Sequence, residues 1–103
     1  MARYRFSNRA LADLDSIVAY TIRTWGERQA SRYLETLHIA CQRLVKSQAI
    51  GRPCEHIRPG LWRRQAGRHV LFFRRVGGDE VFICRILHYR MLPERHPIDD
   101  EDD

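Results

Sequence analysis

Residues 69–88 read HVLFFRRVGGDEVFICRILH, and this stretch decides the fold of the 103-residue chain. The residues Gly77-Gly78-Asp79 lie between two segments rich in aliphatic and aromatic side chains, which is typical of a β-hairpin. Apolar side chains of the second segment occupy both faces, as expected for a central strand that is covered on both sides. One face carries Val81, Ile83 and Leu87, and the other carries Phe82, Cys84 and Ile86. The stretch therefore predicts strands over 69–76 and 81–88.

A further strand is predicted on the amino-terminal side of this hairpin. Residues 61–66 precede Gly67-Arg68, a dipeptide suited to a tight turn into the strand that begins at His69. Pro93 and Pro97 follow the last strand, and regular sheet is expected to end before them because proline cannot donate to a strand ladder. The carboxyl-terminal half is thus expected to form a three-stranded antiparallel sheet.

The amino-terminal half predicts one short strand followed by two helices. Arg3–Phe6 alternates polar and aromatic side chains, and Ser7-Asn8 then offers a helix N-cap. Gly26 separates two runs of apolar residues spaced three and four apart, so the helices must form an antiparallel hairpin. The first run is Leu11, Leu14, Val18, Ile22 and Trp25; the second helix begins near Glu27, carries Ala30, Leu34, Leu37, Cys41 and Leu44, and ends near Ser47. A helical hairpin on one face of an antiparallel sheet is an α+β architecture.

The size of the chain excludes a large enzyme with its own cofactor domain. A protein of 12.2 kDa can bury one modest core, so we expect a single domain over residues 1–98. The longest apolar stretch, Val70–Phe73, is far shorter than the roughly 20 residues of a membrane span. The first six residues lack the apolar region of a secretion signal, and a cytoplasmic location is therefore expected.

The three cysteines predict neither a disulfide framework nor a metal site. Their number is odd, and the sequence contains no CxxC pair and no HExxH motif, so we expect no bound metal and no cofactor. Cys41 and Cys84 fall within apolar segments and are expected in the core. Cys54 lies in a loop with Gly51 and Pro53, and it is the cysteine expected to reach the surface.

Charge is more informative than size. The formal net charge is +5, but residues 99–103 are all acidic, so residues 1–98 carry 18 basic and 8 acidic residues, a net charge of +10. Every basic residue except Lys46 is arginine, whose planar fork binds carboxylates and phosphates at two points. This excess suits an acidic partner, either nucleic acid or an acidic protein segment. The alternative is a solvated surface whose arginines reflect codon bias. The acidic residues 99–103 are expected to be disordered.

The carboxyl-terminal segment carries the most specific pattern, in which Arg85–Met91 (RILHYRM) is followed by Pro93-Glu94-Arg95-His96. Together with shorter pieces in matching order, it makes residues 3–96 resemble the ParE toxins of the RelE/ParE superfamily, the toxin half of type II toxin–antitoxin pairs. Those pieces are Tyr4–Ser7, Ala12–Leu14, Tyr20, Trp25-Gly26, Gln29-Ala30, Tyr33-Leu34, Gly51–Pro53, Arg58–Leu61 and Gly67–Arg74. The chain departs from the common pattern at Leu92, where the family frequently has aspartate, and in its acidic end.

The resemblance implies a fold, a partner and an activity. The family partner is an antitoxin, here a ParD-like protein, whose carboxyl-terminal segment wraps the toxin. The ParE branch is associated with inhibition of DNA gyrase, and the RelE branch cuts messenger RNA in the ribosomal A site. The ending, residues 87–91 followed by 93–96, is similar to the ParE branch, so we expect gyrase inhibition by binding, without chemistry of its own. Ribosome-dependent RNA cleavage, or an activity that is lost or redirected, is the alternative, and a general nucleic-acid binder is the rival class.

The resemblance and the charge pattern together give candidate site residues. The segment expected to contact the target contains His88, Arg90, Met91, Arg95 and His96. A ribonuclease would instead draw on Arg68, Arg74, Arg85, His88, Tyr89 and Arg90 for proton transfer and phosphate stabilisation. If the strand continued past His88, Tyr89 would point away from both His88 and Arg90, which counts against a joint site.

A disordered antitoxin segment that folds on the toxin suits a groove with apolar anchors and a basic rim. The apolar candidates are Trp25, Trp62 and Phe72, and the basic candidates are Arg63, Arg64 and Arg74. Trp25 has an alternative place in the core of the helical hairpin.

Overall fold

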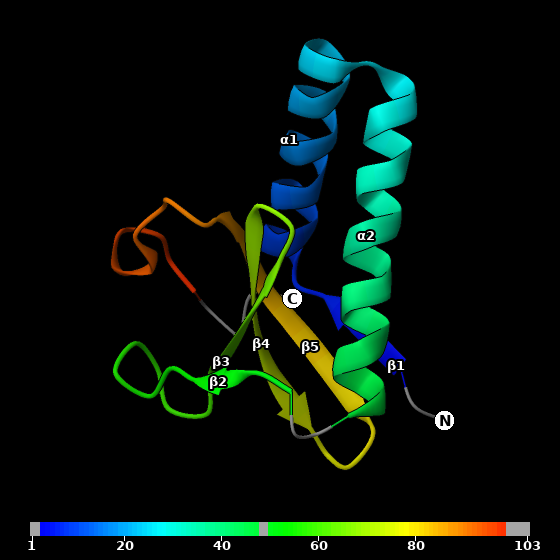
Figure 1. The fold of residues 1–103 in the computed structure, drawn as a ribbon. Coiled ribbons are helices and arrows are strands. Elements are labelled where there is room, and N and C mark those ends of the chain that lie inside the picture. Colours follow the sequence, from blue (N-terminus) through cyan, green and yellow to red (C-terminus); the bar gives the residue numbers. More distant parts are fainter. Residues whose placement is uncertain (1–2, 48–49, 99–103) are drawn as a thin grey trace.

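The computed structural model describes residues 3–47 and 50–98, so the acidic run over 99–103 lies outside the described residues. Two helices cover one face of a five-stranded sheet (Figure 1). In chain order the elements are β1 (Arg3–Phe6), α1 (Asn8–Trp25), α2 (Glu27–Lys46), β2 (Arg52–Pro53), β3 (Trp62–Ala66), β4 (His69–Val76), β5 (Glu80–His88) and the 3-10 helix η1 (Pro93–Arg95). This arrangement confirms the predicted α+β architecture.

The sheet has the strand order β1-β5-β4-β3-β2, and its centre is the predicted meander. Antiparallel pairing joins β3 to β4 and β4 to β5, with His69 opposite His88 and a register shift between Phe72 and Phe73. Two short strands extend the predicted three. β1 pairs in parallel with β5, which places Phe6 beside Ile83, and β2 pairs with Trp62 and Arg63 of β3. The sheet is therefore mixed rather than purely antiparallel.

Ser7 and Gly26 set the limits of α1. The Ser7 hydroxyl accepts a hydrogen bond from the Ala10 amide at 2.9 Å, as an N-cap does, and donates to the Cys84 carbonyl of β5 at 2.8 Å. Gly26, at φ +93°, separates α1 from α2, and its amide donates to the Ile22 carbonyl. Among the described residues, neither helix is long and apolar enough to cross a membrane.

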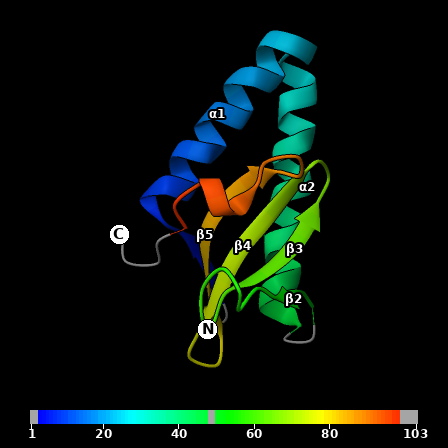
Figure 2. The same ribbon diagram turned by 90° about the vertical axis from the view of Figure 1, so that its left-hand side faces the viewer.

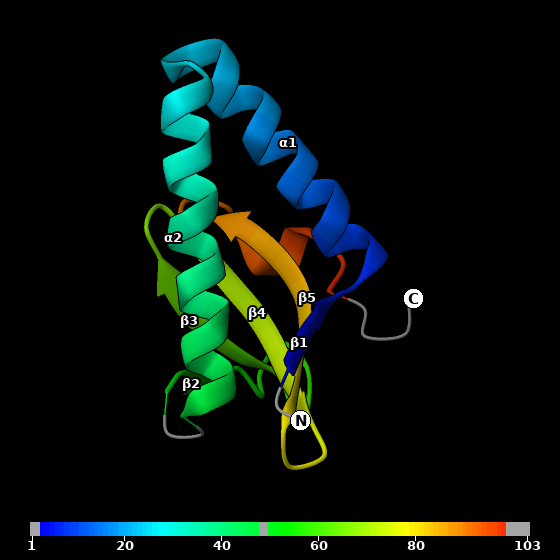
Figure 3. The same cartoon turned by 90° about the vertical axis from the view of Figure 1, so that its right-hand side faces the viewer.

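The predicted inner face of α1 is wrong in part. Ala10 and Thr21 are buried, and Leu14 and Ile17 pack against the core beside them. Most of the other predicted residues are exposed: Leu11, Ile22 and, at 62%, Trp25. For Ile22 and Trp25, which lie in the last turn of α1, the physical reason is visible in Figure 3, where the linked ends of the two helices extend beyond the sheet and have no layer to pack against.

Two apolar clusters lie on opposite faces of the sheet. The cluster beneath the helices joins Leu37, Cys41 and Leu44 of α2 to Leu71 and Phe73 of β4. The cluster on the other face is closed by the loop 54–61 and by the carboxyl-terminal segment, which crosses this face in Figure 2. Its members are Cys54, Leu61, Val70, Phe72, Phe82, Cys84, Leu87 and Ile98.

The expectation that Cys54 reaches the surface is wrong. Cys54 is fully buried because the loop folds back on the sheet, with the Cys54 amide donating to the Leu61 carbonyl at 2.7 Å. Cys41 and Cys84 are buried as predicted. Burial raises the pKa of the Cys41 thiol to about 12 and also raises the pKa of the Cys54 thiol, so both side chains favour the unreactive protonated form.

Candidate functional site

The segment 88–96 leaves the sheet at the end of β5 and turns back over it. The Tyr89 amide donates to the Arg68 carbonyl at 2.9 Å, and the Met91 amide donates to the His88 carbonyl at 2.8 Å, which closes the turn. The predicted target-binding residues line this segment. Arg90, Met91 and Arg95 are exposed, and His88 and His96 are half-buried. Leu92, which departs from the family pattern, is exposed among them. The segment thus presents cationic, aromatic and apolar groups on one short surface.

His88 and Tyr89 lie together, contrary to the prediction from strand alternation. Their ring centroids are 4.7 Å apart with planes inclined by 32°. The prediction failed because β5 ends at His88, and the turn that follows does not alternate side chains. The Arg90 guanidinium lies 5.4 Å from the Tyr89 ring centroid, and its Nε donates to the Tyr89 hydroxyl at 3.1 Å. The three side chains form one surface cluster.

Two residues that the sequence analysis did not single out complete this cluster from the helix side. The Tyr33 hydroxyl of α2 accepts from the Arg68 amide at 2.9 Å and lies 2.5 Å from Nδ1 of His69. The ring of His69 meets that of His88 edge-on, with centroids 5.5 Å apart. Burial, with a smaller contribution from His88, lowers the pKa of His69 to about 4, so this ring is neutral near pH 7. The strands predicted over 69–76 and 81–88 place His69 opposite His88, so this pair could have been found from the sequence.

The six ribonuclease candidates do not converge. Arg68, His88, Tyr89 and Arg90 gather at one end of the sheet, as described above. Arg74 lies five residues along β4 from His69, about 17 Å away at the usual strand rise. There it contacts the Phe82 ring, 4.8 Å from the centroid. Arg85 pairs instead with Asp13 of α1, at 2.8 Å between Nε and Oδ2. Phosphate stabilisation by all four arginines of the set would therefore require a different arrangement.

The candidate antitoxin-binding residues occupy two separate surfaces. Trp25 is exposed at the far end of the helical hairpin, so its alternative place in the hairpin core is wrong. Trp62 is half-buried against the helix-side core, beside the exposed Arg64 on β3. Phe72 is only 2% exposed, under the Arg63 guanidinium, so the prediction that it offers an open apolar anchor is wrong. Its alternation in β4 turns it into the core on the face away from the helices.

A basic groove follows the outer edge of β3. A cleft of about 660 Å³ is lined by residues 50–54 and by His56, Arg63, Arg64 and Gln65. A smaller cleft of about 340 Å³ lies between α2 and β3 and shares Arg64 and Gln65 with the first. β2 covers only Trp62 and Arg63, and within the described part of the chain no strand pairs with the outer edge of 64–66. The groove offers positive charge next to a strand edge that no other described strand covers.

The described residues contain no group of three or more His, Cys, Asp or Glu side chains that could hold a metal ion. The segment 88–96 and the groove along β3 present guanidinium groups, aromatic faces and a strand edge.

Comparison with known proteins places this architecture in a family. A family model described as ParE toxin of the type II toxin–antitoxin system parDE matches residues 4–93. Toxin ParE1 of Mycobacterium tuberculosis (strain ATCC 25618 / H37Rv) is 40% identical over 95 residues, which cover 92% of this chain and 97% of that protein. Toxin ParE1 of Caulobacter vibrioides is 38% identical over 96 residues, covering 93% of this chain and 98% of that protein.

The fold agrees with the sequence comparison. A solved structure titled "Chromosomal ParDE TA system from P. aeruginosa" superposes with a TM-score of 0.70 at 28% identity, covering 85% of this chain and 96% of the matched chain. The chain therefore belongs to the ParE toxin family of type II toxin–antitoxin systems.

Proposed function

We propose that this ParE toxin inhibits DNA gyrase through the segment 88–96 and that a cognate ParD-like antitoxin neutralises it. The observation that carries the proposal is the surface formed by His88, Tyr89 and Arg90 together with the exposed Met91 and Arg95. Guanidinium groups on such a surface can meet the acidic side chains of a protein or the phosphates of DNA bound to it. The toxin acts by binding and makes or breaks no covalent bond.

The antitoxin binds elsewhere, in the basic groove along β3. An acidic, extended segment can pair with the open edge of residues 64–66 and place its carboxylates against Arg52, Arg63 and Arg64. Trp25, exposed at the end of the helical hairpin, offers a second, apolar contact for a segment that wraps the toxin. The positive charge of the groove attracts a negatively charged disordered segment and stabilises the ordered form that this segment takes when it binds.

A gyrase supercoiling and cleavage assay with purified, antitoxin-free protein tests the proposal. The wild-type protein is expected to trap gyrase on cleaved plasmid, so that linear plasmid accumulates. The variant Arg90→Ala/Arg95→Ala is expected to lose this effect. The variant Arg28→Ala/Arg32→Ala removes the same charge from exposed positions of α2 and is the matched control. Equal inhibition by all three folded proteins would contradict the assignment of the target surface.

Ribosome-dependent RNA cleavage is the second candidate, and the cluster around His88 favours it. Four rings form a series of contacts there, in the order Tyr33, His69, His88 and Tyr89, and the Arg90 guanidinium lies over the last of them. Such groups can transfer protons to and from a ribose hydroxyl. Messenger RNA on ribosomes, incubated in parallel with the gyrase assay, separates the two functions. If messenger RNA is cut at codon intervals while the plasmid stays intact, the proposed function changes from gyrase inhibition to RNA cleavage.

A further inference from the structure

The carboxyl-terminal segment is held at its far end by two arginines. The Arg85 Nη1 donates to the Pro97 carbonyl at 2.7 Å, and the Arg58 Nη1 donates to the Ile98 carbonyl at 2.9 Å. Ile98 itself is buried in the apolar cluster on the face away from the helices. At its near end, the segment is held by β5 and by the bond from Tyr89 to the Arg68 carbonyl. The target-binding surface therefore lies on a strap fixed at both ends.

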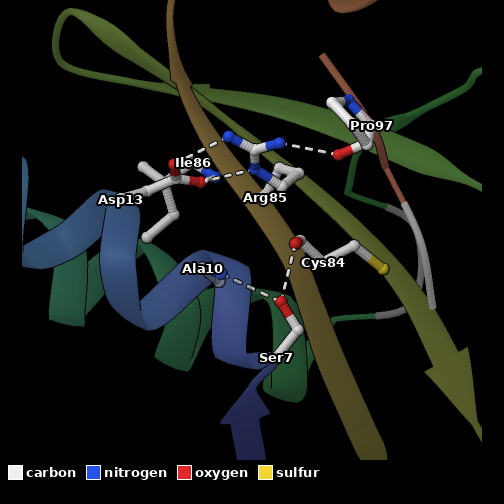
Figure 4. Close-up of polar contacts among 7 residues, drawn as sticks. All are labelled: Ser7, Ala10, Asp13, Cys84, Arg85, Ile86 and Pro97. Carbon is white, nitrogen blue, oxygen red and sulfur yellow. Dashed lines mark hydrogen bonds and ion pairs between the residues drawn. The ribbon is translucent and has the colours of Figure 1, made fainter. Parts of the chain in front are cut away.

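Arg85 is itself held in place by α1. Its Nε and Nη2 donate to the two carboxylate oxygens of Asp13 at 2.8 and 2.9 Å, and Asp13 Oδ2 also accepts from the Ile86 amide at 2.9 Å (Figure 4). The side chains of Arg85 and Asp13 are only 12% and 14% exposed. A guanidinium can make this two-point pair and keep a third donor for Pro97, whereas a lysine ammonium cannot match the same fork.

We propose that Arg85, oriented by Asp13, is a positioning residue that fixes the strap and thereby sets the potency of the toxin. Neither residue needs to touch the target for this role, because the pair faces α1 and the backbone at 97 rather than the exposed side chains of 90–95. A fixed strap presents Arg90, Met91 and Arg95 without the entropy cost of ordering them on binding. The inference rests on the proposed role of segment 88–96 as the target-binding surface.

Hydrogen exchange and potency, measured on the same variants of the full chain, test the inference. Arg85→Lys and Asp13→Asn are expected to speed amide exchange over 93–98 and to weaken potency about tenfold, the scale of one charged hydrogen bond. Exchange in β4 and affinity for the antitoxin are expected to stay at the wild-type level. Arg3→Gln, which removes the ion pair to Glu80 far from the strap, is the control and is expected to change neither readout.

A second variant keeps the test decisive if Arg85→Lys fails to fold. Ile98→Ala loosens the strap without touching the ion pair, and it is expected to lower potency in the same way. In the double variant Ile98→Ala/Asp13→Asn, the loss is expected to be smaller than the product of the two single losses, because both act through one segment. Losses that simply multiply would overturn the shared mechanism.

Potency is scored both on gyrase and as growth arrest after induced expression, so the two proposals can fail separately. Unchanged exchange over 93–98 in the Arg85 and Asp13 variants would overturn the strap. If the variants exchange faster over 93–98 but arrest growth as strongly as the wild-type protein does, the positioning role of Arg85 would be overturned. A wild-type protein that arrests growth but leaves gyrase unaffected would overturn the proposed target, while growth arrest by the variants would still decide the role of Arg85.

Discussion

The turn at Gly67 offers a test of how tightly α2 is fixed to the sheet. Gly67 joins β3 to β4 at φ +59°, and a Cβ built there would lie 2.8 Å from both the ring edge and the hydroxyl of Tyr33. Tyr33 cannot simply move aside. Its hydroxyl accepts from the Arg68 amide at 2.9 Å and lies 2.5 Å from His69 Nδ1. We therefore expect Gly67→Ala to force Tyr33 out of both hydrogen bonds.

The magnitude follows from two separable costs. Alanine in the left-handed region costs about 1 kcal/mol or slightly more. Each of the two hydrogen bonds contributes about 1 kcal/mol, so Gly67→Ala should lower the free energy of unfolding by about 3 kcal/mol. Gly77 provides the matched control. It has φ +68° with nothing within 4 Å of a built Cβ, so Gly77→Ala should cost only the first contribution, about 1 kcal/mol.

Urea denaturation followed by far-ultraviolet circular dichroism measures both free energies of unfolding by linear extrapolation. The expected difference between the two glycine variants is about 2 kcal/mol, which such curves resolve. The background variant Tyr33→Phe removes the hydroxyl and should narrow that difference. Equal destabilisation by Gly67→Ala and Gly77→Ala would refute the reasoning, because it would mean that Tyr33 moves aside without lowering the free energy of unfolding.

Three further predictions concern the interior. Because burial lowers the pKa of His69 from 6.5 to about 4, protons bind the unfolded chain first, and stability should fall as the pH drops from about 6.5 to about 4. Urea midpoints across that range should show a shallower fall for His69→Gln, and an unchanged fall would contradict the assignment. Leu44→Ala, at a fully buried position, should cost about 3 kcal/mol in the same assay, against less than about 0.5 kcal/mol for the exposed Leu92→Ala. The three buried cysteines should react with a thiol reagent only after denaturant is added, and rapid labelling of Cys54 in the folded protein would show that its loop opens.

The predicted elements were those with local signals. The glycines at 67 and 77–78 and the dense apolar run between them defined the β3–β4–β5 meander, and Gly26 defined the helical hairpin. The pairing of β1 was not predictable in the same way. A four-residue strand carries no information about which distant strand it joins, and β2 is only two residues long. The orientation of α1 failed because helical spacing predicts a face but not how much of it meets another layer.

Site residues were predictable as a segment but not as an arrangement. The pattern over 85–96 located the exposed surface, yet only the structure shows that the strand ends at His88 and brings Tyr89 beside it. Arg85 illustrates the difference most directly. From the sequence it was a candidate for phosphate chemistry, and in the fold each of its three nitrogens donates to Asp13 or to the Pro97 carbonyl. Contacts across 72 residues of chain leave no local trace that spacing could reveal.

The pairing of β1 with β5 also sets an order of events during synthesis. Ser7 donates to the carbonyl of Cys84, which is added 77 residues later. Ribosomes add about 5 to 20 residues per second, so roughly 4 to 15 seconds separate the two partners. The helical hairpin is made of local contacts and can form within this interval, whereas the sheet beneath it cannot close. The segment 88–96 therefore takes its final place only after the helical hairpin has been made.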